Sequence, residues 1–186
     1  MMIRYIWGTN TMALYQTSVL KKYTNQLDEV AVDKAYKAYA KYFLHPTIQE
    51  NIRNSKEEQY QATFLNELFV NILGYTLNPK PKFNLTTELK NEIGAKKADG
   101  AILNKEDKAT AVIELKGTNT KDLESIRQQA FDYKANHSSC VYVITSNFEK
   151  LRFYIQNAVE HIEFNLFSLS PDRFALLYLC LHKDHI

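Results

Sequence analysis

Residues 96–117 read KKADGAILNKEDKATAVIELKG and decide the fold. Two runs of mainly small and branched apolar residues flank the polar stretch NKEDK at 104–108. This pattern predicts two antiparallel strands joined by a short turn. The strands nevertheless carry the charged residues Asp99, Glu114 and Lys116. Charges on a half-buried sheet are costly unless something compensates them, so the hairpin predicts a compensating partner.

The spacing of these charges predicts that they converge. Asp99 and Glu114 lie nearly symmetrically about the turn, so the paired strands should bring them close to opposite each other. Side chains alternate along a strand, and Glu114 and Lys116 therefore share a face. Gly117 follows and ends the strand. We expect a cluster of two carboxylates and one ammonium group at one end of a sheet.

Such a cluster has a chemical use. Two carboxylates a few ångströms apart raise each other's pKa, and a bound Mg²⁺ relieves their repulsion because it prefers carboxylate and carbonyl oxygens. The backbone carbonyl of Leu115 could supply a further oxygen. Lys116 could orient or deprotonate a metal-bound water, or neutralise charge that grows on a phosphate. The alternative is a salt-bridged hairpin in which Lys116 pairs with Asp99 or Glu114 and nothing is catalysed.

The rest of the chain predicts an α/β domain with a central mixed β-sheet flanked by helices. Ser55 and Glu58 predict a capping box for the best-marked helix, and Gly74 predicts its end. We expect, in order, two helices within 14–43 that break near 25–29, a short segment opened by Pro46, a helix over 56–73, strands over 83–89, 95–103 and 109–115, a helix over 121–135, strands over 140–146 and 151–156, a mixed segment over 159–167, and a helix over 171–182. We assign 1–54 to a helical extension packed on the core and 55–186 to the core itself.

Composition limits the number of domains, the association with membranes and the cellular compartment that we expect. The 186 residues carry a net charge of +2 and are 45% hydrophobic, which suits a soluble globular protein of one domain. No apolar run approaches the roughly 18 residues of a membrane span, and the amino end lacks the features of a signal peptide. Met12 is a second possible translation start. Two cysteines in apolar runs suit a reducing compartment, so we expect a cytoplasmic location without membrane contact. The five histidines show no metal-binding spacing.

The stretch ADG…IELKG resembles the PD-(D/E)XK nuclease motif, with Asp99 as its Asp and Glu114-Leu115-Lys116 as its ExK. Ala98 stands where that motif often has Pro. The segment QATFLNELFVNILGY is similar to the first core helix of the amino-terminal nuclease domain of type IIG restriction–modification enzymes. RQQAFDY, VYVITSNFEKLRFY and IEFNLFSLSPDRFALLYL are similar to the elements that follow in those domains. The resemblance extends from about Leu14 to the end of the chain.

The resemblance implies the restriction-endonuclease-like fold and a metal-dependent DNA endonuclease that cuts double-stranded DNA with Mg²⁺, for which Mn²⁺ can substitute. Asp99, Glu114 and the Leu115 carbonyl would hold the ion. Type IIG enzymes also carry methyltransferase and target-recognition domains, for which this sequence has no motif. We therefore expect those domains in the same or a neighbouring polypeptide, and this chain to be a fragment, a truncated product or a stand-alone relative. A transient homodimer is expected for double-strand cleavage. The alternative is a catalytically inactive module of the same fold that binds DNA or a protein partner.

The first core helix of such nucleases often adds a carboxylate to the metal site. On a helix of about 100° per residue, the apolar positions between 64 and 73 place Glu58 near the centre of the buried face, Glu57 nearer its edge and Glu67 on the far side. We choose Glu58 as a catalytic and metal-binding residue, with Glu57 second. Glu58 could instead serve only as a helix cap.

Further residues are candidates for catalysis or DNA contact. Gln129 and Tyr133 share one face of the helix after the ExK strand, and the resemblance implies that this face looks into the active site or onto the DNA backbone. Ordinary packing on the sheet is the alternative. Thr118 and Asn119 directly follow the cluster and could touch the cut strand. Lys97 and Arg127 could contact phosphates within a basic rim that also includes Lys80, Lys82, Lys90, Lys96 and Lys134.

Overall fold

The structure is a computed structural model that describes residues 16–90 and 97–186. Its helical amino-terminal part contains α1 (Thr17–Thr24), α2 (Glu29–Phe43), α3 (Pro46–Asn54) and α4 (Glu57–Phe64), and α4 continues as the π-helix η1 (Leu65–Ile72). The remaining elements are β1 (Leu85–Lys90), β2 (Lys97–Leu103), β3 (Ala109–Leu115), α5 (Glu124–Ala135), β4 (Tyr142–Ser146), β5 (Lys150–Ile155), β6 (His161–Asn165) and α6 (Pro171–Leu181). The predicted order of helices and strands is confirmed.

The six strands form one mixed sheet in the order β1-β2-β3-β4-β5-β6. Strands β1 to β3 form an antiparallel meander, and β4 to β6 form a second one. The two meanders meet where β3 pairs with β4 in parallel, and α5 makes the crossover that a parallel pair requires. The predicted α/β fold with a mixed sheet flanked by helices is confirmed.

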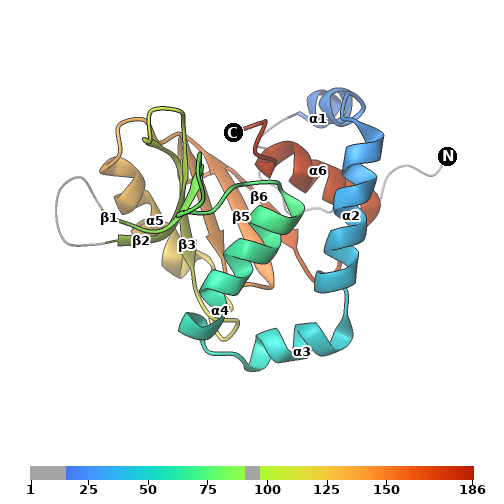
Figure 1. Ribbon diagram of the computed structural model, residues 1–186, viewed down its shortest axis with the longest axis horizontal. Coiled ribbons are helices and arrows are strands. Elements are labelled where there is room, and N and C mark those ends of the chain that lie inside the picture. The colour runs from blue at the N-terminus through green and yellow to red at the C-terminus, as the bar shows by residue number, and fades with distance from the viewer. Residues whose placement is uncertain (1–15, 91–96) are drawn as a thin grey trace.

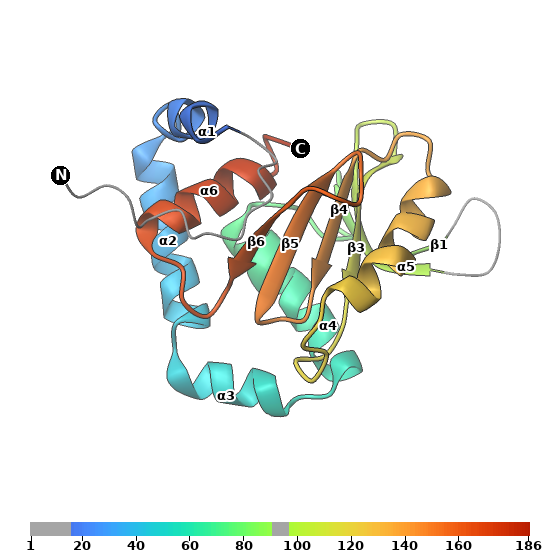
Figure 2. The ribbon, with the colours of Figure 1, turned by 180° about the vertical axis from the view of Figure 1, so that it is seen from behind.

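The two faces of the sheet have different covers. In Figure 1 α4 lies in front of the sheet, and Figure 2 shows α5 in front of β3 and β4 when the molecule is seen from behind. The face on the α4 side packs into the main apolar core, to which α2, η1 and α6 contribute. The α5 face has a smaller apolar cluster in which Ala130 and Tyr133 pack on Val112, Val143 and Tyr154.

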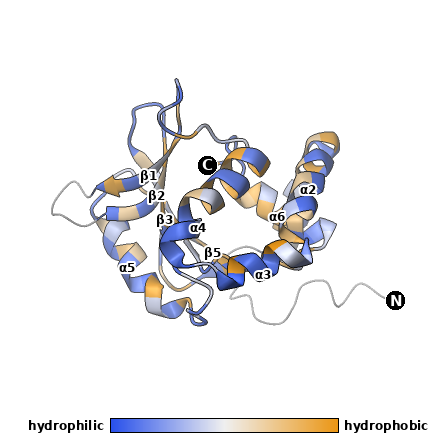
Figure 3. Ribbon diagram, turned by 60° about the horizontal axis from the view of Figure 1, so that its bottom comes forward, coloured by the Kyte–Doolittle hydropathy of each residue, from blue (hydrophilic) through white to orange (hydrophobic). Residues whose placement is uncertain are grey.

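Local sequence explains where these helices begin and end. The Asp28 carboxylate accepts hydrogen bonds from the backbone nitrogens of Val30 and Ala31 at the start of α2, and Ser170 caps α6 in the same way. Gly74 has φ of +80°, which favours glycine and ends the helix as predicted. In Figure 3 the helices carry hydrophilic and hydrophobic residues, as expected when one side of each packs on a core.

The predicted capping box of Ser55 and Glu58 is wrong. The helix begins at Glu57, one residue later than expected, and the Gln59 side chain accepts a hydrogen bond from the backbone nitrogen of Lys56. Glu58 therefore has no part in the cap.

The amino-terminal helices share the main core with the sheet. Tyr39 and Phe43 of α2 are fully buried in it, and the Tyr39 hydroxyl donates to the Leu166 carbonyl at 2.8 Å. The boundary that we drew between 54 and 55 stays a prediction. Within the described ranges 16–90 and 97–186, no helix has the length and apolarity needed to cross a membrane.

Candidate active site

The β2–β3 hairpin brings the predicted charges together. Gly100 pairs with Ile113, so Asp99 and Glu114 follow at the same end of the two strands. The backbone nitrogen of Leu115 donates to Asp99 Oδ2 at 2.7 Å. This bond fixes the Asp99 side chain against the end of β3.

Glu114 is the most buried member of the cluster, with 1% of its surface exposed. Its Oε1 accepts hydrogen bonds from Gln129 Nε2 at 2.6 Å and from Lys116 Nζ at 3.0 Å. Its Oε2 is buried and has no hydrogen-bond partner. A buried carboxylate oxygen without a partner is costly, so this atom is available for a ligand.

Lys116 joins the cluster to α4. Its Nζ donates to the Leu115 carbonyl at 3.1 Å and lies 3.4 Å from Glu57 Oε1. Glu57 Oε2 in turn accepts from the backbone nitrogen of Gly117 at 3.0 Å, which ties the amino end of α4 to the end of β3. The predicted convergence of Asp99, Glu114 and Lys116 is confirmed.

Burial and mutual charge interactions shift the pKa values of the three clustered side chains. Burial, followed by the nearby charge of Asp99, raises the pKa of Glu114 to about 7. Burial also raises the pKa of Asp99. Burial lowers the pKa of Lys116, but the negative charge of Glu114 and its neighbours outweighs that effect, and the net direction is upward. Lys116 is therefore a protonated cation at neutral pH, while Glu114 is poised between its two forms.

Glu57, the second choice of the sequence analysis, takes the place predicted for Glu58. Glu58 is exposed, and its predicted position near the centre of the buried face is wrong. The half-buried Gln61 also joins the site, because its Nε2 lies 3.4 Å from Glu57 Oε1 and it hydrogen-bonds to Asp99. Gln61 was not among the predicted site residues.

The π-helix explains the wrong choice. The apolar positions used to orient the helix lie mostly in η1, where hydrogen bonds span five residues and the angle per residue is smaller than in an α-helix. Within α4 the buried residues are Tyr60 and Phe64. Measured from Phe64 at about 100° per residue, Glu57 lies about 20° away and Glu58 about 120° away. The phase of α4 alone would have selected Glu57.

Two of the predicted DNA contacts lie in the loop after β3. Thr118 is buried, and its hydroxyl donates to the Arg53 carbonyl at 3.2 Å. This burial argues against direct DNA contact by Thr118 and gives it a role in anchoring the loop to α3. Asn119 is exposed beside the cluster, as a DNA contact requires.

The other predicted contacts lie on different sides of the cluster. Lys97 is exposed at the start of β2, on the same end of the hairpin as Lys116, and forms an ion pair with Glu88 at 2.9 Å. Arg127 lies on the flank of α5 away from Gln129, where it pairs with Glu124 at 2.7 Å and donates to the Ala158 carbonyl. The structure does not bring Arg127 to the cluster.

Tyr133 is buried, and its hydroxyl accepts from Gln129 Nε2 at 3.1 Å. It therefore positions Gln129 and packs on the sheet, which fits the structural alternative. Lys96 of the predicted basic rim lies outside the described residues.

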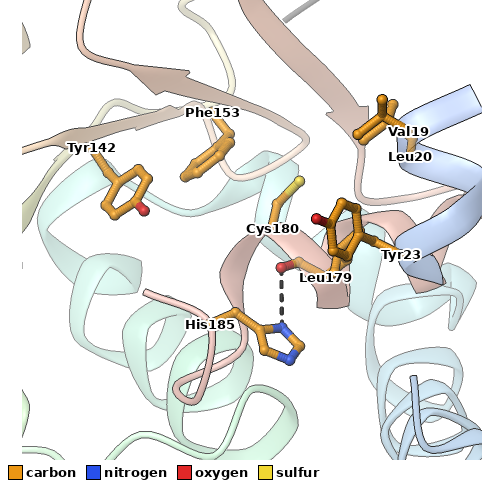
Figure 4. Close-up of a pocket in the computed structure, with 8 residues that line it drawn as sticks. All are labelled: Val19, Leu20, Tyr23, Tyr142, Phe153, Leu179, Cys180 and His185. Carbon is orange, nitrogen blue, oxygen red and sulfur yellow. Dashed lines mark hydrogen bonds between the residues drawn. The ribbon is translucent and has the colours of Figure 1, made fainter. Parts of the chain in front are cut away.

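One partly apolar cavity is remote from these charges. It has a volume of about 320 Å³ and opens between α1, α6 and the sheet (Figure 4). Its wall includes Phe153, which faces the main core, and Tyr142, which lies at the end of β4 away from the cluster. This cavity is on the other face of the sheet and is not part of the candidate site.

The six-stranded mixed sheet and its flanking helices define an α/β domain with a charged cluster at one end of β3. The chain belongs to the family described as "MmeI, N-terminal domain", whose match spans residues 44–184. No curated protein matches the sequence significantly. The relationship to the amino-terminal domain of restriction–modification enzymes is thereby confirmed at the level of family and fold.

Two solved structures are similar. A DrdV–DNA complex determined by cryo-electron microscopy matches 81% of this chain with a TM-score of 0.51 and 18% identity. The type IIG restriction endonuclease BpuSI matches 74% of this chain with a TM-score of 0.38 and 18% identity. This chain spans only 14% and 16% of those two chains, respectively. The DrdV likeness supports the fold.

Proposed function

We propose that this domain is a metal-dependent DNA endonuclease that hydrolyses phosphodiester bonds, the cleavage module of a type IIG restriction–modification system. The observation that carries the proposal is the convergence of Asp99, Glu114 and Lys116 around a buried carboxylate oxygen that has no partner. A buried carboxylate oxygen has more than one lone pair, so Oε2 can accept a metal ion even where a protein hydroxyl also donates to it.

The residues present fit a hard divalent cation. Among residues 16–90 and 97–186, no three His, Cys, Asp or Glu side chains are arranged as a complete metal site. Asp99, Glu114 and the Leu115 carbonyl nevertheless offer an all-oxygen set, and Mg²⁺ commonly takes one or two carboxylates and keeps several waters. Burial raises the pKa values of both carboxyl groups, and the charge of Lys116 offsets only part of that rise. We propose Mg²⁺ as the natural ion and Mn²⁺ as a substitute.

Each of the other side chains in the cluster then has a defined role. Bound Mg²⁺ would polarise the phosphate and lower the pKa of a bound water. Lys116 Nζ, held protonated between Glu114 and Glu57, would orient the attacking water and offset negative charge on the phosphate oxygens. Gln129 Nε2 occupies one lone pair of Glu114 Oε1 and so fixes the direction of that carboxylate. Glu57 holds Lys116 and the Gly117 backbone in place.

DNA is the proposed substrate. The DrdV structure is a DNA complex, and this chain corresponds to a small part of that protein. Lys97 and Asn119 are exposed near the cluster and are proposed to contact the DNA backbone. We propose that methyltransferase and target-recognition domains act with this domain from the same or a neighbouring polypeptide. Two active sites are needed to cut both strands, so a transient homodimer on DNA is part of the proposal.

Nicking of supercoiled plasmid tests the proposal. The protein at high concentration with Mn²⁺ should give weak, nonspecific nicking that chelation abolishes. Asp99→Asn should abolish it, because the variant loses a charged ligand while keeping the shape of the side chain. Asp107→Asn is the matched control in the exposed turn of the same hairpin, where φ is +58° and asparagine is tolerated.

The same experiment separates the inactive binding module from the enzyme. A binding module would retain duplex DNA equally with and without Mn²⁺ and in Asp99→Asn, and would cut nothing. Equal nicking by the parent and by Asp99→Asn would also contradict the proposed site, because the activity would then arise elsewhere.

A further inference from the structure

A row of polar side chains crosses the sheet beneath α5 and continues from the candidate active site. The register pairs Glu114 with Thr145, Thr145 with Arg152, and Arg152 with Glu163. Residues paired in register on neighbouring strands point to the same face, so these side chains share the α5 face. At the far end of the row Arg152 forms ion pairs with Glu163 and Glu124. The charges of Arg152 and Glu163 are therefore compensated within the protein.

Thr145 is the member whose side chain lacks an assigned purpose. It is completely buried, and its Oγ1 has no hydrogen-bond partner. Valine has nearly the same shape and would fill this position without a buried hydroxyl. The neighbouring Glu114 carries the other unpartnered oxygen of the row, Oε2. Adjacent strands lie about 4.8 Å apart, a span that a glutamate side chain and a threonine hydroxyl bridge by rotation about their own bonds.

Tyr154 lies on the other side of Thr145. Burial raises the pKa of Tyr154, whereas Arg152 and Thr145 lower it through interactions with its phenol, which places both beside the Tyr154 hydroxyl. A threonine hydroxyl donates one hydrogen bond and accepts others, whereas a carboxylate only accepts. The Tyr154 hydroxyl can therefore donate to Thr145 Oγ1, an arrangement that leaves the Thr145 proton for Glu114 Oε2.

We propose that Thr145 is a positioning residue of the active site, whose hydroxyl donates to Glu114 Oε2 and holds this carboxylate in the orientation that binds the metal ion. The inference deepens the proposed nuclease function and rests on it for the metal. Gln129 holds Oε1 from α5 while Thr145 holds Oε2 from β4, so the two oxygens of Glu114 are fixed from opposite sides. Partners of this kind set ligand orientation and typically change metal affinity by about 10- to 100-fold when removed.

The first test needs no metal. Thermal unfolding is compared for the parent, Thr145→Val and Thr145→Ser, each also in a Glu114→Met background that removes the carboxylate at similar size. Thr145→Val should lower the melting temperature of the parent but leave it unchanged or raise it with Glu114→Met, and Thr145→Ser should behave as the parent. Equal shifts in both backgrounds would overturn the proposed pairing.

The second test measures Mn²⁺ affinity by calorimetry. Thr145→Val should weaken binding about tenfold or more, Thr145→Ser should restore it, and Tyr154→Phe should weaken it less. DNA affinity should be unchanged in all three. Equal Mn²⁺ affinity in Thr145→Val and the parent would overturn the positioning role. If the parent binds no Mn²⁺, the proposed metal function fails, while the unfolding comparison still decides whether Thr145 holds Glu114.

Discussion

The two faces of the sheet have opposite characters. The face toward α2, η1 and α6 is filled by large apolar side chains, among them the fully buried Phe64 and Phe164. The face toward α5 carries a polar row that begins at Glu114 and contains buried groups whose hydrogen bonds are incomplete. The apolar face should therefore contribute most of the stability, whereas the buried carboxylate of the α5 face should cost stability and serve chemistry. Four substitutions, taken in order of expected effect, can break or sharpen this contrast.

The largest effect is expected on the apolar face. Phe64 is completely buried and packs against Phe43, Phe69 and Phe148. Phe64→Ala should lower the free energy of unfolding by about 3–5 kcal/mol, measured by urea denaturation. Val30→Ala, at a side chain that is 79% exposed, is the control and should change it little. A loss below about 1 kcal/mol for Phe64→Ala would show that this face does not dominate stability.

The second-largest effect is expected on DNA cleavage, with folding and metal binding unchanged. Lys116→Ala should lower Mn²⁺-dependent DNA cleavage by about 10²- to 10³-fold, because it removes the cation that acts on the water and the phosphate. The variant should still fold and bind Mn²⁺, as seen by circular dichroism and calorimetry. Lys121→Ala, at an exposed lysine in the following loop, should cut DNA at the parent rate. If Lys116→Ala cuts as well as the parent, the mechanism is wrong.

The third effect is a pH dependence of stability. Glu114 has a pKa of about 7 in the folded protein, above its ordinary value of 4.5. Between these values the folded protein binds more protons than the unfolded chain, so this contribution to stability is present at low pH and is lost as the pH rises through 7. Glu114→Gln removes this dependence and should be more stable than the parent by roughly 3 kcal/mol at pH 8. Urea denaturation between pH 5 and 8 measures the difference, and parallel curves would contradict the assignment.

The smallest effect separates two adjacent glutamates. Glu57→Gln should slow DNA cleavage about tenfold, because it weakens the contacts to Lys116 and the Gly117 backbone. Glu58→Gln should be neutral, since this side chain is exposed. Plasmid nicking rates of the two variants are measured side by side. If Glu58→Gln slowed cleavage more than Glu57→Gln, Glu58 would be the functional carboxylate, as the sequence predicts.

Much of this contrast could be predicted from the sequence. The alternation of apolar residues and the polar turn predicted the hairpin, and the near-symmetry of Asp99 and Glu114 about that turn predicted that they lie at the same end of it, because both depend only on local strand geometry. Gln129 was predicted through the resemblance of RQQAFDY to the helix after the ExK strand of type IIG nucleases, and its bond to Glu114 follows from the packing of α5 on β3.

What could not be predicted depends on backbone geometry or on distant contacts. The π-helix changes the helical phase, and apolar periodicity does not reveal it, so Glu58 was chosen before Glu57. The burial of Thr118 depends on the Arg53 carbonyl, 65 residues earlier in the chain. Thr145 reads as an ordinary β-branched strand residue, and only the strand order places it beside Glu114.

The central claim is that Asp99 and Glu114 bind a divalent cation beside Lys116. Crystals of the protein grown with Mn²⁺, measured at the manganese absorption edge, test this claim most directly. The account predicts an anomalous difference peak bounded by the Asp99 and Glu114 carboxylates and the Leu115 carbonyl. Anomalous peaks found only elsewhere, with Lys116 still paired to Glu114 at saturating Mn²⁺, would contradict it.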